Sequence, residues 1–467
     1  MSEQYEQLLR GIPRYTSYPP ATAFYEPATP SDLLAQAAAQ FNPRDDLSFY
    51  IHIPFCRSLC YYCGCNKTVT RSNDLVNRYL AALKKEIEAK ADLFKHQGRI
   101  TQLHFGGGTP TFLSAEQIGD ILYWVKSRFN LDFSQPGDYS IEVDPRTADR
   151  KKIFALAALG FNRISFGIQD INPHVQEAIH RIQPIEMNTR VIQAAKDAGF
   201  SSINLDILYG LPEQGLNDLA NTVEQVIKWA PDRVALFPYA HLPKRFPSQR
   251  LIATNRLADT DLRTSMFEQA QAQLCNADFM QIGQDHFAKA HDTMAIAAQN
   301  NELHRNFQGY THVKAENVLA VGASAISSIG YIYAQNVVDA KAYIAAMETE
   351  QGSCYRGYPL TQDDIIRSRV IGDLMCRGEL HIKEIESAFD ISFIEYFAEP
   401  LKRLEHYKTA GIVAIDSRMI KLMPDSVHLG RIVCATFDRY LSPEALNVTA
   451  AVAQEEVGRR NALKETS

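Results

Sequence analysis

The feature that most constrains the fold is a regular alternation of strand-like and helical segments between residues 47 and 239. The strand-like runs are Leu47–Ile53, Ile100–Phe105, Tyr139–Val143, Arg163–Ile168, Ser202–Tyr209 and Arg233–Tyr239. Helical patterns lie between them, at Asp74–Phe94, Ala115–Phe129, Asp149–Leu159, Pro173–Ala198 and Leu216–Trp229. Parallel strands need long crossover connections, which are usually helices. Six such units therefore predict an α/β fold built on a parallel sheet.

Polar residues follow the carboxyl ends of these strands. In chain order they are a four-cysteine stretch at 56–65, the turn GGGTPT at 106–111, Glu142 with Asp144, Gln169 with Asp170, Asp206, and Tyr239 to His241. A single carboxylate at a strand end more often caps a helix or pairs with a lysine. Six such groups at one edge of a parallel sheet instead indicate a functional site, because α/β folds place their sites at that edge.

The chain outside this alternation divides into a leading arm and a trailing domain. RYTSYPP at 14–20 predicts an extended arm, and we assign residues 1–35 to it. Residues 36–350 are assigned to the catalytic domain, in which VGASAISSIG at 321–330 predicts a strand followed by a close backbone approach. Residues 351–467 are predicted as a smaller, mostly helical domain. Its helices, hairpin-like pair and a helix through Phe437 and Tyr440 resemble a winged-helix domain.

Composition limits the partners of the chain. Its 467 residues are 46% hydrophobic and 22% charged, which is typical of a soluble globular protein. The formal charge is −6, and residues 363–425 carry nine Lys and Arg against twelve Asp and Glu, or −3, so nucleic acid is not an expected partner. No signal-peptide start and no run of about 18 apolar residues is present. We expect a cytoplasmic protein without a membrane partner.

The stretch CRSLCYYCGC at 56–65 predicts a metal centre. In a reducing compartment, clustered cysteines favour metal binding over disulfides. The CxxxCxxC spacing of Cys56, Cys60 and Cys63 lets one loop hold three irons of a [4Fe-4S] cluster and leaves the fourth iron open. A zinc site that uses Cys65 as fourth ligand is the alternative, although Cys63 and Cys65 lie closer in sequence than zinc ligands usually do. The three glycines of GGGTP permit a ligand to approach the backbone closely.

CxxxCxxC after one strand, GGGTP after the next and six strand–helix units together resemble the radical S-adenosylmethionine (SAM) superfamily. That resemblance implies a partial (β/α)6 barrel. Within the superfamily, the chain from Arg14 to Tyr440 resembles oxygen-independent coproporphyrinogen III oxidases. The motifs that carry this resemblance are PRYTSYP at 13–19, YIHIPFC at 50–56, CYYCGCNK at 60–67, HFGGGTPT at 104–111, IEVDPR at 141–146, GIQD at 167–170, LDILYGLP at 205–212, YAHLP at 239–243, DHFA at 285–288 and HRNFQGY at 304–310.

Carried over position by position, the resemblance implies a set of site residues. The cluster ligands would be Cys56, Cys60 and Cys63. A first SAM would be bound by Tyr50, Gly107, Glu142 and Ile326. A second SAM would be bound by Tyr62, Gly108, Thr109, Gln169, Arg181, Asp206 and Ala240. Cys65 resembles the extra, non-ligating cysteine of the family, for which a catalytic role is expected.

The implied reaction converts two propionates of coproporphyrinogen III into vinyl groups through a 5′-deoxyadenosyl radical from SAM, giving protoporphyrinogen IX. The substrate carries four carboxylates, so a local basic pocket is expected, with Arg14 and Arg305 as candidates. A low-potential donor such as flavodoxin or ferredoxin and a monomeric state are also expected.

Three other functions remain open at this point. A related radical SAM enzyme could open or methylate haem, and a haem chaperone could use the same barrel without turnover. The pair Gly64–Cys65 and the RYTSYP arm argue against the chaperone. A zinc-stabilised structural or DNA-binding module is disfavoured by charge and by the six strand-end sites.

Overall fold

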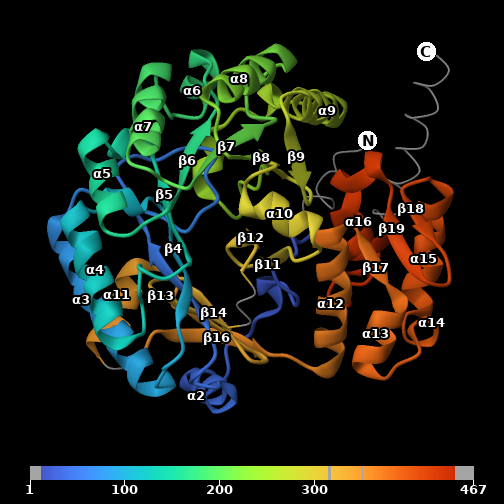
Figure 1. Ribbon diagram of the computed structural model, residues 1–467, viewed down its shortest axis with the longest axis horizontal. Helices are drawn as coiled ribbons and strands as arrows, with labels where there is room; N and C mark the ends of the chain where they lie inside the picture. The colour runs from blue at the N-terminus through green and yellow to red at the C-terminus, as the bar shows by residue number, and fades with distance from the viewer. Residues whose placement is uncertain (1–11, 314–316, 350, 448–467) are drawn as a thin grey trace.

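The computed structural model describes residues 12–313, 317–349 and 351–447 (Figure 1). Its core is a curved parallel sheet of six neighbouring strands, as the alternation predicts. These strands are β1 (Leu47–Ile53), β4 (Ile100–Gly107), β5 (Asp138–Val143), β6 (Arg163–Gln169), β7 (Ser202–Tyr209) and β8 (Arg233–Pro238), hydrogen-bonded in that order. The predicted partial (β/α)6 barrel is confirmed.

Five helices cover the outer face of the sheet (Figure 1). They are α3 (Asn73–Phe94), α4 (Ala115–Arg128), α5 (Arg150–Ala158), α7 (Ile185–Asp197) and α8 (Leu216–Trp229). Their starts follow ordinary capping chemistry. Ser114 Oγ accepts from the backbone N–H of Gln117, and the Ser114 N–H donates to Gln117 Oε1. These two hydrogen bonds form a capping box. Buried aliphatic residues on each helix then pack on the strands in one continuous core.

The helix predicted over Pro173–Ala198 is wrong in one respect, because the structure breaks it in two. Helix α6 (Pro173–Ala178) ends before His180, whose φ is +54°, and α7 starts after Pro184. Proline removes a backbone donor and disfavours helical geometry in the residue before it. The resulting loop carries Arg181 toward the cysteine stretch instead of leaving it on a helix surface.

The sheet continues beyond the six predicted strands on both sides. On the β1 side follow β13 (Asn317–Val321), which is parallel, and the antiparallel strands β14 (Ile326–Ile329), β15 (Ile332–Asn336) and β16 (Cys354–Pro359). On the β8 side follow β10 (His286–Lys289) and β9 (Phe279–Ile282). The run 321–330 therefore holds the end of one strand, a tight turn and a second strand. At Gly322 the φ is +99°, and a Cβ would lie 2.6 Å from the carbonyl oxygen of His52, so the expected close approach is present.

Smaller elements complete this part of the chain. They are α2 (Ser31–Gln40), β2 (Phe55–Cys56), β3 (Thr68–Val69), α9 (Thr260–Asn276), α10 (Thr293–Gln299), β11 (His304–Asn306), β12 (Gly309–Thr311) and α11 (Ala340–Glu348). Within the described residues, no helix has the length and apolar character that a membrane crossing requires.

The C-terminal elements stand beside the barrel, in orange and red in Figure 1. They are α12 (Gln362–Arg377), β17 (Glu379–His381), α13 (Ile382–Phe389), α14 (Phe393–Tyr396), α15 (Ala398–Thr409), β18 (Val413–Ile415), β19 (Met419–Leu422) and α16 (Gly430–Ala435), with a sheet in the order β17-β19-β18. The predicted winged-helix-like arrangement of helices and hairpin is present. Helix α16 ends at Ala435, so the predicted helix through Phe437 and Tyr440 is wrong. Residues 436–440 form turns, in which Asp438 accepts from the backbone N–H of Tyr440.

The N-terminal arm packs into this C-terminal unit. Ile12, Tyr15 and Tyr18 are buried within its apolar core. The hydroxyl of Tyr15 donates to Asp438 at 2.9 Å, across 423 residues of sequence. Strand β16, meanwhile, joins the barrel sheet through β15. The division into residues 1–35, 36–350 and 351–467 stays a prediction.

Candidate active site

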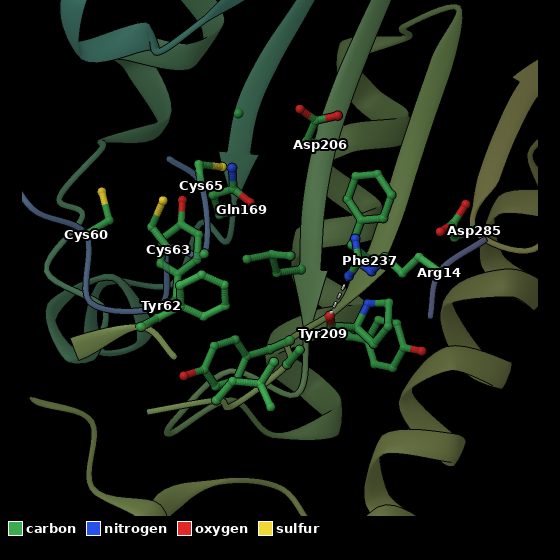
Figure 2. A pocket seen from close by; sticks show the side chains of 18 of the residues that line it. Arg14, Cys60, Tyr62, Cys63, Cys65, Gln169, Asp206, Tyr209, Phe237 and Asp285 are labelled. Carbon is green, nitrogen blue, oxygen red and sulfur yellow. Dashed lines mark hydrogen bonds between the residues drawn. The ribbon is translucent and has the colours of Figure 1, made fainter. Parts of the chain in front are cut away.

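A cavity of about 880 Å³ lies at the carboxyl ends of the parallel strands. It is lined by most of the residues that sequence reasoning selected, namely Cys56, Cys60, Tyr62, Cys63, Cys65, Gly107, Gly108, Thr109, Glu142, Gln169, Arg181, Asp206 and Ala240, with Arg14 and Arg305. Figure 2 shows the thiols of Cys60, Cys63 and Cys65 at one end and Arg14 with Asp285 at the other. The strand-end groups thus converge on one space.

Two of the selected residues do not line this cavity. Tyr50 is in β1, stacks on His104 at 5.8 Å between ring centroids, and hydrogen-bonds to His52 Nδ1 at 3.0 Å. Ile326 begins β14 opposite Gln335. Their roles as SAM contacts stay predictions.

The cysteine loop is closed at its base by a short parallel pair, β2 with β3. The backbone N–H of Thr68 donates to Pro54 O at 2.7 Å, and that of Thr70 donates to Cys56 O at 3.1 Å. On the far side of the loop, Tyr61 stacks on His180 at 4.9 Å. Anchors at both ends hold the loop, so the three thiols keep fixed positions at the cavity wall.

Cationic groups surround these thiols. Cys60 Sγ accepts from Arg146 Nη2 at 3.3 Å and from Arg181 Nη1 at 3.6 Å. Both guanidinium groups also bind Asp144, at 2.7 Å and 3.0 Å. Burial alone would raise the pKa of Asp144, but Arg181 and Arg146 lower it to about 2. Two arginines fixed by one carboxylate leave a net positive environment at Cys60, which suits a thiolate.

The other two thiols have contrasting environments. A hydrogen bond from Cys65, opposed by burial and supported by Lys67, lowers the pKa of Cys63 to about 6. Lys67 Nζ also donates to Cys63 O at 2.9 Å. Burial raises the pKa of the Cys56 thiol to about 11, although Thr109 Oγ1 lies 3.5 Å from its sulfur. Because Cys65 hydrogen-bonds to Cys63, it lies next to the CxxxCxxC set without being part of that motif.

The glycine turn after β4 lies directly against the cysteine loop. At Gly107 the φ is +121°, and its N–H donates to Glu142 Oε2 at 3.2 Å. A Cβ on Gly108 would lie 2.6 Å from Pro54 O and 3.1 Å from Cys56 Sγ. Only glycine leaves room at this position for the backbone and for a group bound to the sulfur.

Replacing Gly108 with alanine is expected to push the turn away from the cysteine loop and to lower the iron content of the purified protein. Its Cβ would clash with a backbone oxygen that cannot rotate away, and overpacking of this kind costs about 1–3 kcal/mol. The measurements are iron per chain and the urea unfolding midpoint. Gly372→Ala, in helix α12 with nothing within 4 Å of the added Cβ, is the matched control. Wild-type iron content in Gly108→Ala would contradict the expectation.

Carboxylates and amides line the middle of the cavity. Glu142 keeps 44% of its side chain exposed, and its Oε1 lies 3.3 Å from His104 Nε2. Asp206 accepts from Asn204 Nδ2 at 2.7 Å and from Ser165 Oγ at 3.1 Å. Gln249 bridges two predicted contacts, because its Nε2 donates to Tyr62 O at 2.8 Å and to Ala240 O at 3.1 Å. This region offers acceptors for ammonium and hydroxyl groups.

Asp206 is expected to make stability depend on pH. Burial first, and then the Glu142 carboxylate, raise its pKa from the ordinary 3.8 to about 6. Between those pH values the folded chain keeps a proton that the unfolded chain has lost, so the free energy of unfolding falls as pH rises. Asparagine at position 206 does not titrate, so this fall in the free energy of unfolding is absent from Asp206→Asn. Relative to wild type, Asp206→Asn should gain about 1–1.5 kcal/mol between pH 5 and pH 7, measured by anaerobic urea unfolding. A difference that does not change with pH would refute this.

Sequence reasoning missed three arginines of the site. Arg146 was visible in the motif IEVDPR, but nothing in the motif indicated that its guanidinium contacts Cys60. Arg263 in α9 and Arg431 in α16 line the cavity from segments without a recognisable pattern. Only the folded chain brings them to this site.

Comparison with known proteins bears directly on this geometry. Residues 50–226 match the Radical SAM superfamily. The chain is 41% identical over 429 residues to the oxygen-independent coproporphyrinogen III oxidase of Pseudomonas aeruginosa, covering 92% of this chain and 93% of that one. It is 41% identical over 433 residues to the Escherichia coli oxidase, covering 93% and 94%. The chain belongs to the oxygen-independent coproporphyrinogen III oxidase family.

A solved structure of the same family agrees with the fold. The coproporphyrinogen III oxidase of Escherichia coli, described as a radical SAM enzyme, superimposes with a TM-score of 0.87 at 40% identity. The match covers 93% of this chain and 99% of that one, so it includes the C-terminal unit as well as the barrel.

Membership of this radical SAM family implies a [4Fe-4S] cluster and SAM as cofactors. The donor types at this site fit a cluster, although among the described residues no three Cys, His, Asp or Glu side chains are already gathered around one metal position. Cys60 contacts Arg146 and Arg181, Cys63 lies near Lys67, and Gly108 leaves the space beside Cys56 that a Cβ would fill. Thiolates are the ligands that iron–sulfur clusters use.

Proposed function

We propose that this protein converts two propionates of coproporphyrinogen III into vinyl groups without oxygen, giving protoporphyrinogen IX. The observation that carries this proposal is one cavity with cysteine thiols at one end and arginines at the other. Relatives at 41% identity over almost the whole chain carry this activity in their names. For each vinyl group, a 5′-deoxyadenosyl radical takes a hydrogen atom from the carbon β to the carboxylate and becomes 5′-deoxyadenosine. The bond to the carboxylate then breaks, CO2 leaves, and the remaining electron passes to a one-electron acceptor.

In this proposal, Cys56, Cys60 and Cys63 ligate the cluster. These three thiols would hold a [4Fe-4S] cluster, which would supply the electron for cleavage of SAM to a 5′-deoxyadenosyl radical. Arg146 and Arg181 stabilise the thiolate of Cys60 through hydrogen bonds to its sulfur. Cys65, which contacts Cys63 rather than completing the ligand set, is assigned a separate catalytic role.

SAM contacts are assigned to the middle of the cavity. Glu142 is positioned to accept from an ammonium group, and its bond from the Gly107 N–H fixes its carboxylate. Two SAM molecules are proposed. Tyr50, Gly107, Glu142 and Ile326 belong to the first, and Tyr62, Gly108, Thr109, Gln169, Arg181, Asp206 and Ala240 belong to the second. The Gln249 bridge between Tyr62 and Ala240 supports grouping these two residues in one site.

The remaining parts of the proposal concern the setting of the reaction. We propose a cytoplasmic monomer that receives electrons from a low-potential protein such as flavodoxin or ferredoxin. None of the eight cysteines forms a disulfide.

An anaerobic assay of the reconstituted protein tests the function. The protein is given SAM and either coproporphyrinogen III or haem, and CO2 and 5′-deoxyadenosine are followed. Turnover of the coproporphyrinogen with release of two CO2 is expected. Turnover of haem alone would instead support a haem-utilising enzyme, and porphyrin binding without 5′-deoxyadenosine would support a chaperone.

A further inference from the structure

The end of the cavity away from the cysteines is strongly basic. Arg14, Arg263, Arg305 and Arg431 line it, with Asp285 as the carboxylate among them. Asp285 accepts from His286 Nδ1 at 2.7 Å. Although burial opposes it, His286 and the arginines lower the pKa of Asp285 to about 2, so it is ionised at neutral pH. Four guanidinium groups against one carboxylate leave an excess of positive charge in a partly enclosed space.

Three of these arginines are held by the protein itself. Arg14 lies over the Phe237 ring at 5.5 Å, and its Nη2 is 3.5 Å from Pro238 O. Arg305 lies over the Tyr310 ring at 4.2 Å, with Nη2 donating to Arg14 O at 3.4 Å. Arg263 Nη2 donates to Tyr239 O at 2.9 Å. These contacts fix the positions of the three side chains.

Arg431 differs from them. It is the second residue of α16, and its side chain lines the cavity within reach of the charges of Arg14, Tyr209 and Asp285. Among the residues that the structure describes, no hydrogen bond or ion pair is formed by its guanidinium group. Burial, and then the nearby charge of Arg14, lower its pKa. Arg431 is partly exposed to the cavity. A partly buried cation beside another cation is stabilised when an anion binds to it.

We propose that Arg431 binds a carboxylate of the substrate, one that the reaction leaves intact. This inference rests on the proposed function, in which the substrate carries four carboxylates and keeps two. Figure 2 shows Arg14 and Asp285 at the end of the cavity away from the cysteine thiols. If the reacting propionate lies near the cysteine end, carboxylates on the opposite side of the macrocycle reach the arginines. A guanidinium group pairs with a carboxylate through two parallel hydrogen bonds. The C-terminal unit thereby contributes a binding residue to the barrel cavity.

The test compares Arg431→Gln and Arg431→Lys with a control, Arg418→Gln, whose side chain is exposed on the same C-terminal unit. Coproporphyrin III, an air-stable porphyrin with four carboxylates, is titrated by fluorescence. Loss of one charge-assisted pair predicts a Kd and a KM about 10- to 100-fold higher for Arg431→Gln, with kcat changed much less. Arg431→Lys should recover part of the affinity. Iron content and the thermal unfolding midpoint establish that each variant is folded.

Several outcomes would overturn the proposal. An Arg431→Gln protein that binds coproporphyrin III within twofold of wild type excludes the contact. If Arg418→Gln weakened coproporphyrin III binding as much as Arg431→Gln, the loss of affinity would come from the net charge of the protein and not from a contact of Arg431. If wild type binds the porphyrin but does not turn over coproporphyrinogen III, the proposed function fails while the titration still decides the role of Arg431. A wild-type protein that neither binds the porphyrin nor turns over coproporphyrinogen III refutes both.

Discussion

Replacing Cys60 with serine is expected to abolish the brown iron–sulfur absorbance and to reduce decarboxylation to background. Cys60 is buried, and its sulfur is the one that both Arg146 and Arg181 contact. A serine hydroxyl is a poor ligand for iron beside soft thiolates, and it does not become an anion there. The visible absorption spectrum, iron per chain and anaerobic CO2 release measure the result. We expect the largest loss of activity among the predictions from this variant.

Two other cysteine variants make this result specific. Cys275→Ser, at an exposed cysteine of α9, should retain cluster and turnover. Cys65→Ser should retain the cluster and lose decarboxylation, because Cys65 is assigned outside the ligand set. A Cys60→Ser protein that keeps both colour and activity would refute the ligand assignment. A Cys65→Ser protein that loses its iron would make Cys65 a ligand and reopen the four-cysteine zinc-like arrangement.

Replacing Glu86 with alanine is expected to cause the largest loss of stability, about 3–5 kcal/mol. Glu86 and Lys90 of α3 form an ion pair at 2.8 Å, with only 1% and 3% of each residue exposed. The glutamate also accepts from four groups of later elements. These are the N–H of Gly322 at 2.7 Å, Asn336 at 2.7 Å, Tyr343 at 2.6 Å and Ser353 at 2.7 Å. Alanine leaves a buried ammonium and several donors without their acceptor.

Urea unfolding measures this loss of stability, and two further variants show whether it comes from the buried charge network. The double variant Glu86→Leu/Lys90→Met removes both charges, so it should recover part of the stability that Glu86→Ala loses. Glu348→Ala breaks the exposed ion pair with Arg78 and should leave the unfolding midpoint close to wild type. An unfolding midpoint for Glu86→Ala equal to that of Glu348→Ala would show that the buried network does not stabilise the fold.

The parallel strands and the cysteine loop could be predicted because their signals are local. A buried strand such as Ser202–Tyr209 can be recognised from eight residues of sequence, and so can the CxxxCxxC motif at 56–63. The helix break at 179–184 also has a local signal, because Pro184 lies inside the predicted helix Pro173–Ala198. The helical periodicity on both sides of Pro184 nevertheless favoured one continuous helix. Resemblance supplied the residue roles, including that of Cys65, which spacing left open.

What could not be predicted depends on contacts between distant segments. Strands β15 and β16 are short, and they join the sheet only through β14 and β13, of which β13 pairs with β1. Arg431 lies in an ordinary helical stretch and enters the cavity only because the C-terminal unit packs beside the barrel. The same holds for Arg263. No motif marks a residue whose role depends on such packing.

The burial of the arm by the last part of the chain sets an order for maturation. Tyr15 leaves the ribosome among the first residues, yet its partner Asp438 follows 423 residues later. The cysteine loop and the six strands from β1 to β8, by contrast, are complete once residue 238 has been synthesised. Arg431, which lines the other end of the cavity, follows about 190 residues later. A prematurely terminated chain would retain the metal loop and lack the basic end of the cavity.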